Sequence, residues 1–357
     1  MSYQRQFDRR VRVAVVGLGS HSYRNVLPSL TYLPVELVAV CDVDAELART
    51  TARQYGDVPA YGDAGEMYQN EDLDAVLLCV SPQLHPPLAR QAFAVGLSVW
   101  MEKPAGVSSA AVSELLAARG DRVCVVGYKK AFQPATRKAV ELLAQPGFEP
   151  LHSILAVYPM SIPKAGDPAN DPSAPRPSKW LADGCHPLAL LLELGGDVES
   201  LAVHRSSAGG GALVLNYASG AVGTFHLADG VPAFQPSERY TCIGSGASIT
   251  IDNTSTVVYQ RGIPFRYATG TTFAPEGTDS GAIVWQAQNT MNTLENKAEF
   301  LQGLVGSLQH FCDSVLAGTP STIGTLETAV RIGQIYEAAL ESRGDVVPLP
   351  PPLRSSS

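Results

Sequence analysis

Short apolar runs alternate with amphipathic stretches through the first 130 residues of the chain. Val11–Val16 is valine-rich and is interrupted only by Arg12, as expected of a central parallel strand that is buried on both faces. Similar runs follow at 37–41, 75–80, 98–101 and 123–126. Apolar residues at helical spacing lie between some of them, at Leu47, Ala48, Thr51, Ala52 and Tyr55, and at Leu88, Ala89, Ala92 and Phe93. The alternation predicts an α/β domain with a doubly wound parallel sheet over 11–130.

After residue 130 the pattern changes from strand–helix repeats to hairpins. A helix is predicted over 134–143, and short separate strands over 154–158, 213–217, 221–227, 240–243 and 248–252. Tight turns at 218–220 and 244–246 join two pairs of these strands, which implies antiparallel pairing. Two helices are predicted near the end, one from the stripe Phe300, Leu304, Leu308, Phe311 and Val315, and one over 326–340. We expect a second, α+β domain over 131–345 with an open, mainly antiparallel sheet.

Three segments carry no regular pattern. Residues 1–10 are expected to form a flexible arm, and 346–357, with a run of prolines, a flexible tail. Residues 163–177 hold five prolines and few apolar side chains, which predicts a long loop. Because long loops inside a domain are usually functional or mobile, we expect 163–180 to help shape a binding pocket.

Composition narrows the class of protein. With 357 residues the chain is long enough for two domains, and 45% hydrophobic and 17% charged residues are typical of a globular protein. A net charge of −8 argues against nucleic acid as a partner, since phosphates require a basic face. No apolar run approaches the roughly 20 residues of a membrane helix, and we recognise no signal peptide, so a cytoplasmic protein is expected.

The cysteines and histidines do not form a metal motif. The six cysteines are scattered without a Cys-x-x-Cys pair, and we interpret them as buried thiols in a reducing compartment. Cys185 and His186 are neighbours, but no third or fourth ligand follows at a suitable spacing. We therefore expect no metal site.

A glycine-rich loop follows the first predicted strand. Gly17 ends that strand, Gly19 follows at the spacing of the G-x-G-x-x-G fingerprint, and the third position holds Ser22, which is also small. The first glycine allows a tight turn, the second lets the backbone approach a pyrophosphate, and the helix that follows supplies amide donors. Because the loop lies between a strand and a helix, it predicts a dinucleotide site of the Rossmann type. The expected contacts are Gly17, Gly19, Ser20 and His21.

An acidic residue at the end of the second predicted strand completes the fingerprint. Asp42 is placed to accept hydrogen bonds from the adenosine ribose. Asp44 adds a second negative charge, which would repel a 2′-phosphate. We therefore favour NAD as the cofactor, with NADP possible if Arg49 or Arg53 turns toward the site.

Further motifs resemble those of the Gfo/Idh/MocA oxidoreductase family. They follow the glycine loop and Asp42 in order along nearly the whole chain: Ser81-Pro82 with His85, Glu102-Lys103-Pro104, Gly127-Tyr128-Lys129-Lys130 with Pro134, and Asp183-Gly184-Cys185-His186. The resemblance implies hydride transfer between NAD or NADP and a CH–OH group, or the corresponding ketone, of a sugar, cyclitol or related polyol. It also implies a homodimer or homotetramer built on the open sheet.

The resemblance assigns roles to individual residues. Lys103 would contact the nicotinamide ribose and the reacting oxygen, and His186 would be the proton acceptor. Further cofactor contacts are expected at Ser81, His85 and Glu102. Substrate contacts are expected at Tyr128, Lys130, Lys179 and Trp180.

The chain departs from the family pattern at two positions. The family usually has an aspartate four residues before the histidine, where this chain has Ala182. We expect Asp183 to take over the orientation of His186. The motif after Tyr128 usually ends in arginine, and Lys129-Lys130-Ala131 in its place points to an atypical substrate.

The proposed chemistry also follows from the residue types. A carbinol carbon releases hydride only as its hydroxyl proton is removed, so a base must lie within hydrogen-bond reach. A histidine has a suitable pKa, and a lysine buried beside a cationic nicotinamide can donate or relay a proton. Two other functions remain open at this point: a non-catalytic dinucleotide sensor and an NAD-dependent glycosidase.

Overall fold

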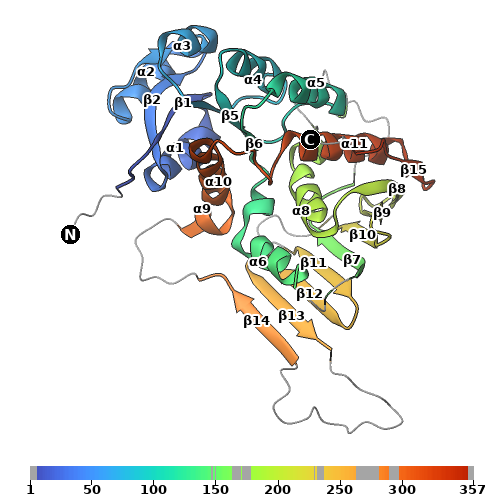
Figure 1. Cartoon of the computed structure of the whole chain (residues 1–357). Coiled ribbons are helices and arrows are strands. Elements are labelled where there is room, and N and C mark those ends of the chain that lie inside the picture. Colours follow the sequence, from blue (N-terminus) through green and yellow to red (C-terminus); the bar gives the residue numbers. More distant parts are fainter. Residues whose placement is uncertain are drawn as a thin grey trace, which may run out of the picture.

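Two β-sheets organise the fold, which Figure 1 shows from the side. The computed structural model describes residues 6–145, 148, 150–162, 170, 178–228, 230, 237–262, 281–288 and 297–352. The predicted loop at 163–177, apart from Asn170, lies outside these residues. Within the described part of the chain, no helix is both long and apolar enough to cross a membrane.

The first sheet has six parallel strands in the order β3-β2-β1-β4-β5-β6. They are β1 (Val11–Val16), β2 (Val35–Cys41), β3 (Ala60–Tyr61), β4 (Ala75–Leu78), β5 (Ser98–Met101) and β6 (Cys124–Val126). In β1, Val13, Ala14 and Val15 are completely buried, as the valine-rich sequence predicts. This strand order is that of the Rossmann fold, so the predicted doubly wound sheet is confirmed.

Helices cover both faces of this sheet. One face packs against α3 (Ala64–Asn70), α4 (His85–Ala94) and α5 (Ser109–Arg119). The other packs against α1 (Leu27–Ser29) and α2 (Ala45–Gln54). The helix after the glycine loop is irregular: a π-helical turn, η1 (Ser22–Val26), precedes α1, and a 3-10 turn, η2 (Leu30–Tyr32), follows it. Pro28 has no N–H to donate and crowds the preceding turn, which favours this widened geometry.

A helix from the end of the chain completes the second of these faces. In α10 (Leu304–Ala317), Leu308, Phe311 and Cys312 pack in the same buried cluster as β1. The Trp100 indole of β5 donates a buried hydrogen bond of 2.9 Å to the Ser307 hydroxyl. The division expected at residue 130 therefore separates the strands of the two sheets, but a helix from beyond residue 130 packs on the first sheet.

The second sheet has nine strands in the order β14-β13-β12-β11-β7-β10-β9-β8-β15. The central strands are β7 (Leu151–Tyr158), β8 (Val198–Arg205), β9 (Gly211–Tyr217), β10 (Val222–Leu227) and β11 (Arg239–Gly244). The outer ones are β12 (Ala247–Asp252), β13 (Thr256–Arg261), β14 (Gly281–Gln286) and β15 (Val347–Pro348). Only β7 and β10 pair in parallel among these strands. The predicted open, mainly antiparallel sheet is thus confirmed, including the hairpins β9–β10 and β11–β12.

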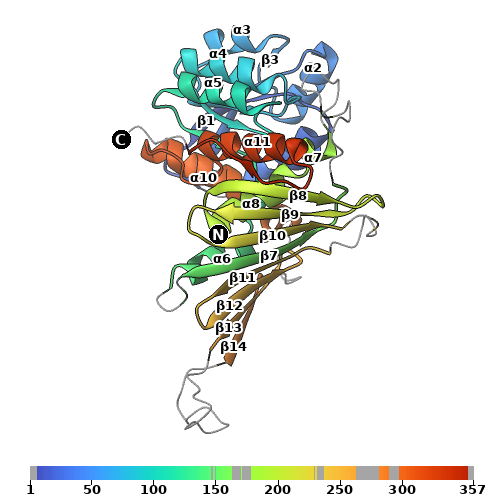
Figure 2. The same ribbon diagram turned by 90° about the vertical axis from the view of Figure 1, so that its right-hand side faces the viewer.

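Among the described residues, helices pack on one face of the second sheet only. These are α6 (Pro134–Leu143), α8 (Cys185–Gly195) and α11 (Leu326–Glu341), with the short α7 (Lys179–Ala182) before α8. Figure 2 shows β8 to β14 side by side with no helix in front of them. On this open face Leu155 is 47% exposed and Val222 is 42% exposed.

The end of the chain is ordered further than predicted. Instead of a flexible tail from 346, β15 pairs with β8, and the Leu349 N–H donates to the Glu199 carbonyl at 2.8 Å. The Arg331 guanidinium of α11 donates to the Pro350 carbonyl. These long-range bonds compensate for the low apolar content of the segment. Residues 353–357 lie outside the described chain.

Candidate active site between the two domains

The glycine loop has the backbone conformation that its sequence predicts. Gly17 has φ of +88°, and a Cβ there would lie 2.4 Å from the Cys79 carbonyl oxygen, so only glycine fits. At Gly19 a Cβ would meet no atom within 4 Å. The surface beside Gly19 is therefore open, which leaves room for a pyrophosphate against the backbone.

Asp42 lies directly beside this loop, at the carboxyl end of β2. Its Oδ2 accepts a hydrogen bond of 2.8 Å from the Leu18 N–H, and its Oδ1 accepts one of 2.9 Å from the Asp44 N–H. Asp44 caps α2 by accepting from the Glu46 and Leu47 amides. Each Asp42 oxygen retains a lone pair for a ribose hydroxyl. The residues present thus fit the adenosine and pyrophosphate parts of a dinucleotide.

A cavity of about 560 Å³ opens next to the loop, and both domains form its walls. Many of its lining side chains are charged or polar. The lining residues are His21, Asn25, Cys79, Val80, Glu102, Lys103, Gly127, Lys129, Lys130, Tyr158, Asp183, His186, Glu299, Gln302 and Leu304.

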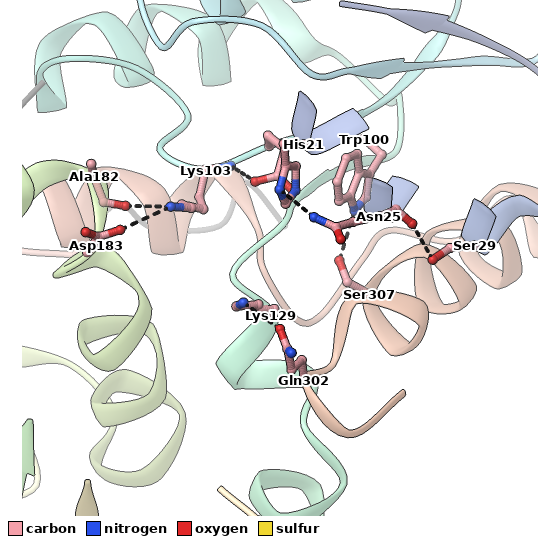
Figure 3. Close-up of polar contacts among 11 residues, drawn as sticks. His21, Asn25, Ser29, Trp100, Lys103, Lys129, Ala182, Asp183, Gln302 and Ser307 are labelled. Atoms are coloured by element: carbon pink, nitrogen blue, oxygen red, sulfur yellow. Dashed lines mark hydrogen bonds and ion pairs between the residues drawn. The ribbon is translucent and has the colours of Figure 1, made fainter. Parts of the chain in front are cut away.

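Lys103 crosses from the first domain to the second. It follows β5, and its ammonium donates to the Ala182 carbonyl at 2.8 Å and lies 3.6 Å from Asp183 Oδ1 (Figure 3). The Lys103–Pro104 peptide bond is cis. His85 Nδ1 donates to the Pro104 carbonyl at 2.8 Å. His85, predicted to contact the cofactor, is completely buried beneath this loop and holds it in place.

His21 and Glu102 meet across the opening of the glycine loop. His21 Nε2 lies 2.9 Å from Glu102 Oε1, and the Asn25 amide lies 2.9 Å from His21 Nδ1 (Figure 3). Because an amide N–H donates to Nδ1, Nε2 carries the proton and donates to the carboxylate. Glu102 Oε2 accepts from the Lys103 N–H at 3.1 Å. The structure thus brings three predicted cofactor residues together.

His186 lies near the start of α8 and is 6% exposed. The turn before it requires Gly184, because a Cβ there would lie 2.4 Å from the Trp180 carbonyl oxygen. Burial lowers the pKa of His186 well below its ordinary value, and the positive charges of Lys103, Lys129 and other neighbours lower it further. The imidazole is therefore neutral at physiological pH and can accept a proton.

We expected the Asp183 side chain to orient the His186 imidazole, but it does not contact that ring. Its carboxylate faces Lys103, and only its backbone carbonyl bonds the His186 N–H. A shift of one residue from position 182 turns a side chain by roughly 100° in helical geometry. Among the described residues, His186 Nδ1 has no hydrogen-bond partner. The Asp183 carboxylate therefore lies beside the Lys103 ammonium and not beside the His186 ring.

The other predicted residues lie at different distances from the cavity. Lys130 lines it, and its ammonium donates to both oxygens of Glu238 at 2.8 and 2.7 Å. Tyr128 and Trp180 are buried in the core, with Trp180 stacked on Tyr336. Exposed positions hold Ser81 and Lys179, which do not line the cavity.

Several cavity residues were not predicted from the sequence. Lys129 belongs to the motif Gly127-Tyr128-Lys129-Lys130, in which Lys130 was predicted to contact the substrate, so that motif could have pointed to Lys129 as well. Tyr158 ends β7, and Glu299 and Gln302 belong to or follow α9 (Lys297–Leu301). No motif marks these three, because long-range packing alone brings their segments to the cavity.

Comparison with known proteins identifies a family that the first domain matches. Residues 11–129 match the model of the Gfo/Idh/MocA oxidoreductase family, described as an NAD-binding Rossmann fold. An inositol 2-dehydrogenase of Acidothermus cellulolyticus is 30% identical over 132 residues, which cover 36% of this chain and 39% of that protein. A 4-carboxy-2-hydroxymuconate-6-semialdehyde dehydrogenase of Sphingobium is 28% identical over 127 residues, or 35% and 40% of the two chains.

The whole chain also has a known fold. An oxidoreductase from Agrobacterium radiobacter, solved with NAD+, L-tartaric acid and magnesium, superimposes with a TM-score of 0.77. The match covers 95% of this chain and 98% of that one at 16% identity. The N-terminal domain therefore matches the NAD-binding Gfo/Idh/MocA oxidoreductase family, which confirms the resemblance over residues 11–129, and the full chain shares the fold of the solved structure.

The low pKa of His186 can be tested directly. We expect it to lie below the 6.5 of an ordinary histidine, and we expect Lys103→Met to raise it by removing a nearby positive charge. Because burial is the larger cause, the pKa of the variant should stay below 6.5. Ring NMR signals followed against pH give both values, with His186→Gln for assignment. An unchanged or lower pKa in Lys103→Met would contradict this account.

Proposed function

We propose that this protein is an NAD(P)-dependent oxidoreductase that transfers hydride between the nicotinamide and a CH–OH group, or its ketone, of a sugar, cyclitol or related polyol. The observation that carries the proposal is the presence of Lys103 and His186 in one cavity beside a dinucleotide loop. The names of the sequence relatives, which include an inositol 2-dehydrogenase, support this class of substrate.

The two residues divide the work. When bound, the nicotinamide would supply the acceptor or donor of the hydride, while the residues of the chain bind the reacting oxygen and move its proton. His186, kept neutral by its surroundings, takes the hydroxyl proton through its ring. Lys103 retains N–H donors beyond its bond to Ala182, and these stabilise the negative charge that develops on the reacting oxygen. Asp183 holds the ammonium in place.

Substitutions should separate these roles. With an inositol or sugar panel, we expect Lys103→Ala and His186→Ala each to lower kcat on the order of 10²-fold or more while NAD binding survives. Asp183→Asn should have a smaller effect, since Lys103 keeps its bond to Ala182. Reduced-nicotinamide absorbance reports turnover, and fluorescence titration reports binding. Turnover by His186→Ala at the wild-type rate would refute the proton-acceptor role. Cleavage of a glycosidic bond without net turnover of the cofactor would indicate a glycosidase. A protein that shows neither activity would be a dinucleotide sensor.

Cofactor preference follows from the ribose end of the site. Asp42 and Asp44 place negative charge there, and Arg49 is engaged by Glu46 at 3.0 Å. We expect tighter binding of NAD than of NADP. Asp42→Ala should weaken NAD and narrow the difference, because it removes the acceptor for the ribose hydroxyls. Parallel calorimetric titrations measure both; equal or stronger NADP binding by the wild type would refute the preference.

We also propose that the chain forms a homodimer or homotetramer through the open face of the second sheet. Leu155 and Val222 expose apolar surface there, and closed symmetric assembly is the usual outcome for such a face. Sedimentation velocity at micromolar concentration should show an oligomer. Leu155→Lys should shift it toward monomer, whereas Val95→Lys, which inserts the same charge at an exposed valine after α4 in the first domain, should not. A monomeric wild type would exclude the assembly.

A further inference from the structure

Three lysine ammonium groups face the proposed active-site cavity, and two of them form an ion pair with a carboxylate. Lys130 is buried against Glu238 with two short hydrogen bonds, and its ammonium lies 5.3 Å from the centre of the Tyr158 ring. Lys103 has Asp183 at 3.6 Å together with the Ala182 carbonyl. Both positive charges are thus balanced by the protein itself.

Lys129 is in a different position. It begins η3 (Lys129–Phe132), its side chain lines the cavity, and its ammonium donates to the neutral Gln302 amide oxygen at 3.0 Å (Figure 3). No carboxylate in the described part of the chain forms an ion pair with it. Burial lowers its pKa, and the charges of Lys130 and Lys103 lower it further, while the nearby carboxylates of Glu102 and Glu299 act in the opposite direction. An ammonium that is partly buried beside two other lysines is stabilised by an anionic partner, and Lys129 has none within ion-pair distance in the described part of the chain.

Glu299 does not supply that partner. Its carboxylate lines the same cavity. Burial raises the pKa of Glu299, and the positive charge of Lys129 lowers it by a smaller amount. The two groups are therefore near each other, yet they form no ion pair. The Lys129 ammonium keeps free N–H donors on the cavity side.

We propose that the substrate carries a carboxylate, as a polyhydroxylated acid does, and that Lys129 binds it. The inference rests on the function proposed above, since it places the reacting CH–OH between Lys103 and His186 and the acid group at Lys129. Gln302 strengthens the site: its carbonyl oxygen already accepts from Lys129, so its amide nitrogen can donate to the second carboxylate oxygen. A neutral polyol would leave the ammonium without a counter-charge.

The arrangement favours a carboxylate over a phosphate. Phosphate groups are commonly bound by arginine forks, by several cations or by a glycine-rich backbone nest, because each carries up to two charges and three oxygens. Here the Lys129 ammonium, which has no ion-pair partner among the described residues, and the neutral Gln302 amide lie together at the cavity wall. One charge and two donors match one carboxylate.

Matched substrates test the proposal. Gluconate, galactonate and glucuronate are compared with glucitol, galactitol and glucose in the presence of NAD at physiological pH, where His186 is neutral. At least one acid should have a kcat/KM about tenfold or more above its neutral counterpart, since a hydrogen bond to a charged group contributes roughly 1.5–3 kcal/mol. Gluconate 6-phosphate should gain nothing over gluconate.

Variants assign the effect to Lys129. Lys129→Gln should raise KM for the acid about tenfold or more and leave KM for the neutral substrate nearly unchanged, whereas Lys129→Arg, which keeps the charge, should retain the preference. Lys138→Gln removes the same charge from α6, where Lys138 pairs with Glu141, and should change neither value. Equal losses for acid and neutral substrate in Lys129→Gln would overturn the inference.

Calorimetry separates this inference from the proposed function. Gluconate, galactonate and glucuronate are titrated into the NADH-loaded protein, wild type and Lys129→Gln. Binding of at least one acid that depends on Lys129, without turnover of any substrate, would support the carboxylate site and refute the oxidoreductase assignment. Turnover of neutral polyols with no acid binding would leave the assignment intact and overturn the carboxylate site.

Discussion

The hydrogen bond between the Lys103 ammonium and the Ala182 carbonyl joins the two domains at the point where the proposed chemistry takes place. Its geometry depends on rigid elements at both ends. On one side, β5 ends in a loop whose Pro104 carbonyl is held by the buried His85. On the other, Gly184 lets the chain turn tightly against Trp180 before α8 begins. Displacing either support would move Lys103 relative to His186.

The same interdomain packing builds both the core and the cavity. α10 covers a face of the parallel sheet, and the buried Trp100–Ser307 bond connects its first turn to β5. Gln302 immediately precedes this helix, so the packing that completes the hydrophobic core also brings a polar side chain beside Lys129. Stability and site geometry therefore depend on the same contacts.

Charge burial gives the cavity its chemical character. Burial lowers the pKa of His186 most, and the ammonium groups of Lys103, Lys129 and Lys130 lower it further, so the imidazole is neutral and able to accept a proton. Carboxylates compensate two of these lysines, at Asp183 and Glu238. The proposed base thus lies among lysines, and the one of these three without an ion pair among the described residues is the group proposed above to bind an anionic substrate.

Local sequence signals by themselves determined the parallel sheet, the hairpins of the second sheet, the glycine loop with Asp42, and the positions of Lys103 and His186. Each depends on a short-range rule: hydrophobic period, turn residues, or a backbone angle such as that of Gly17. Tertiary structure alone decided that Asp183 faces Lys103, that Tyr128 is buried, and that the chain end pairs with β8. It also decided which distant residues reach the cavity, such as Gln302. The physical reason is that side-chain direction and pairing between segments far apart in the chain are set by packing, which no local pattern records.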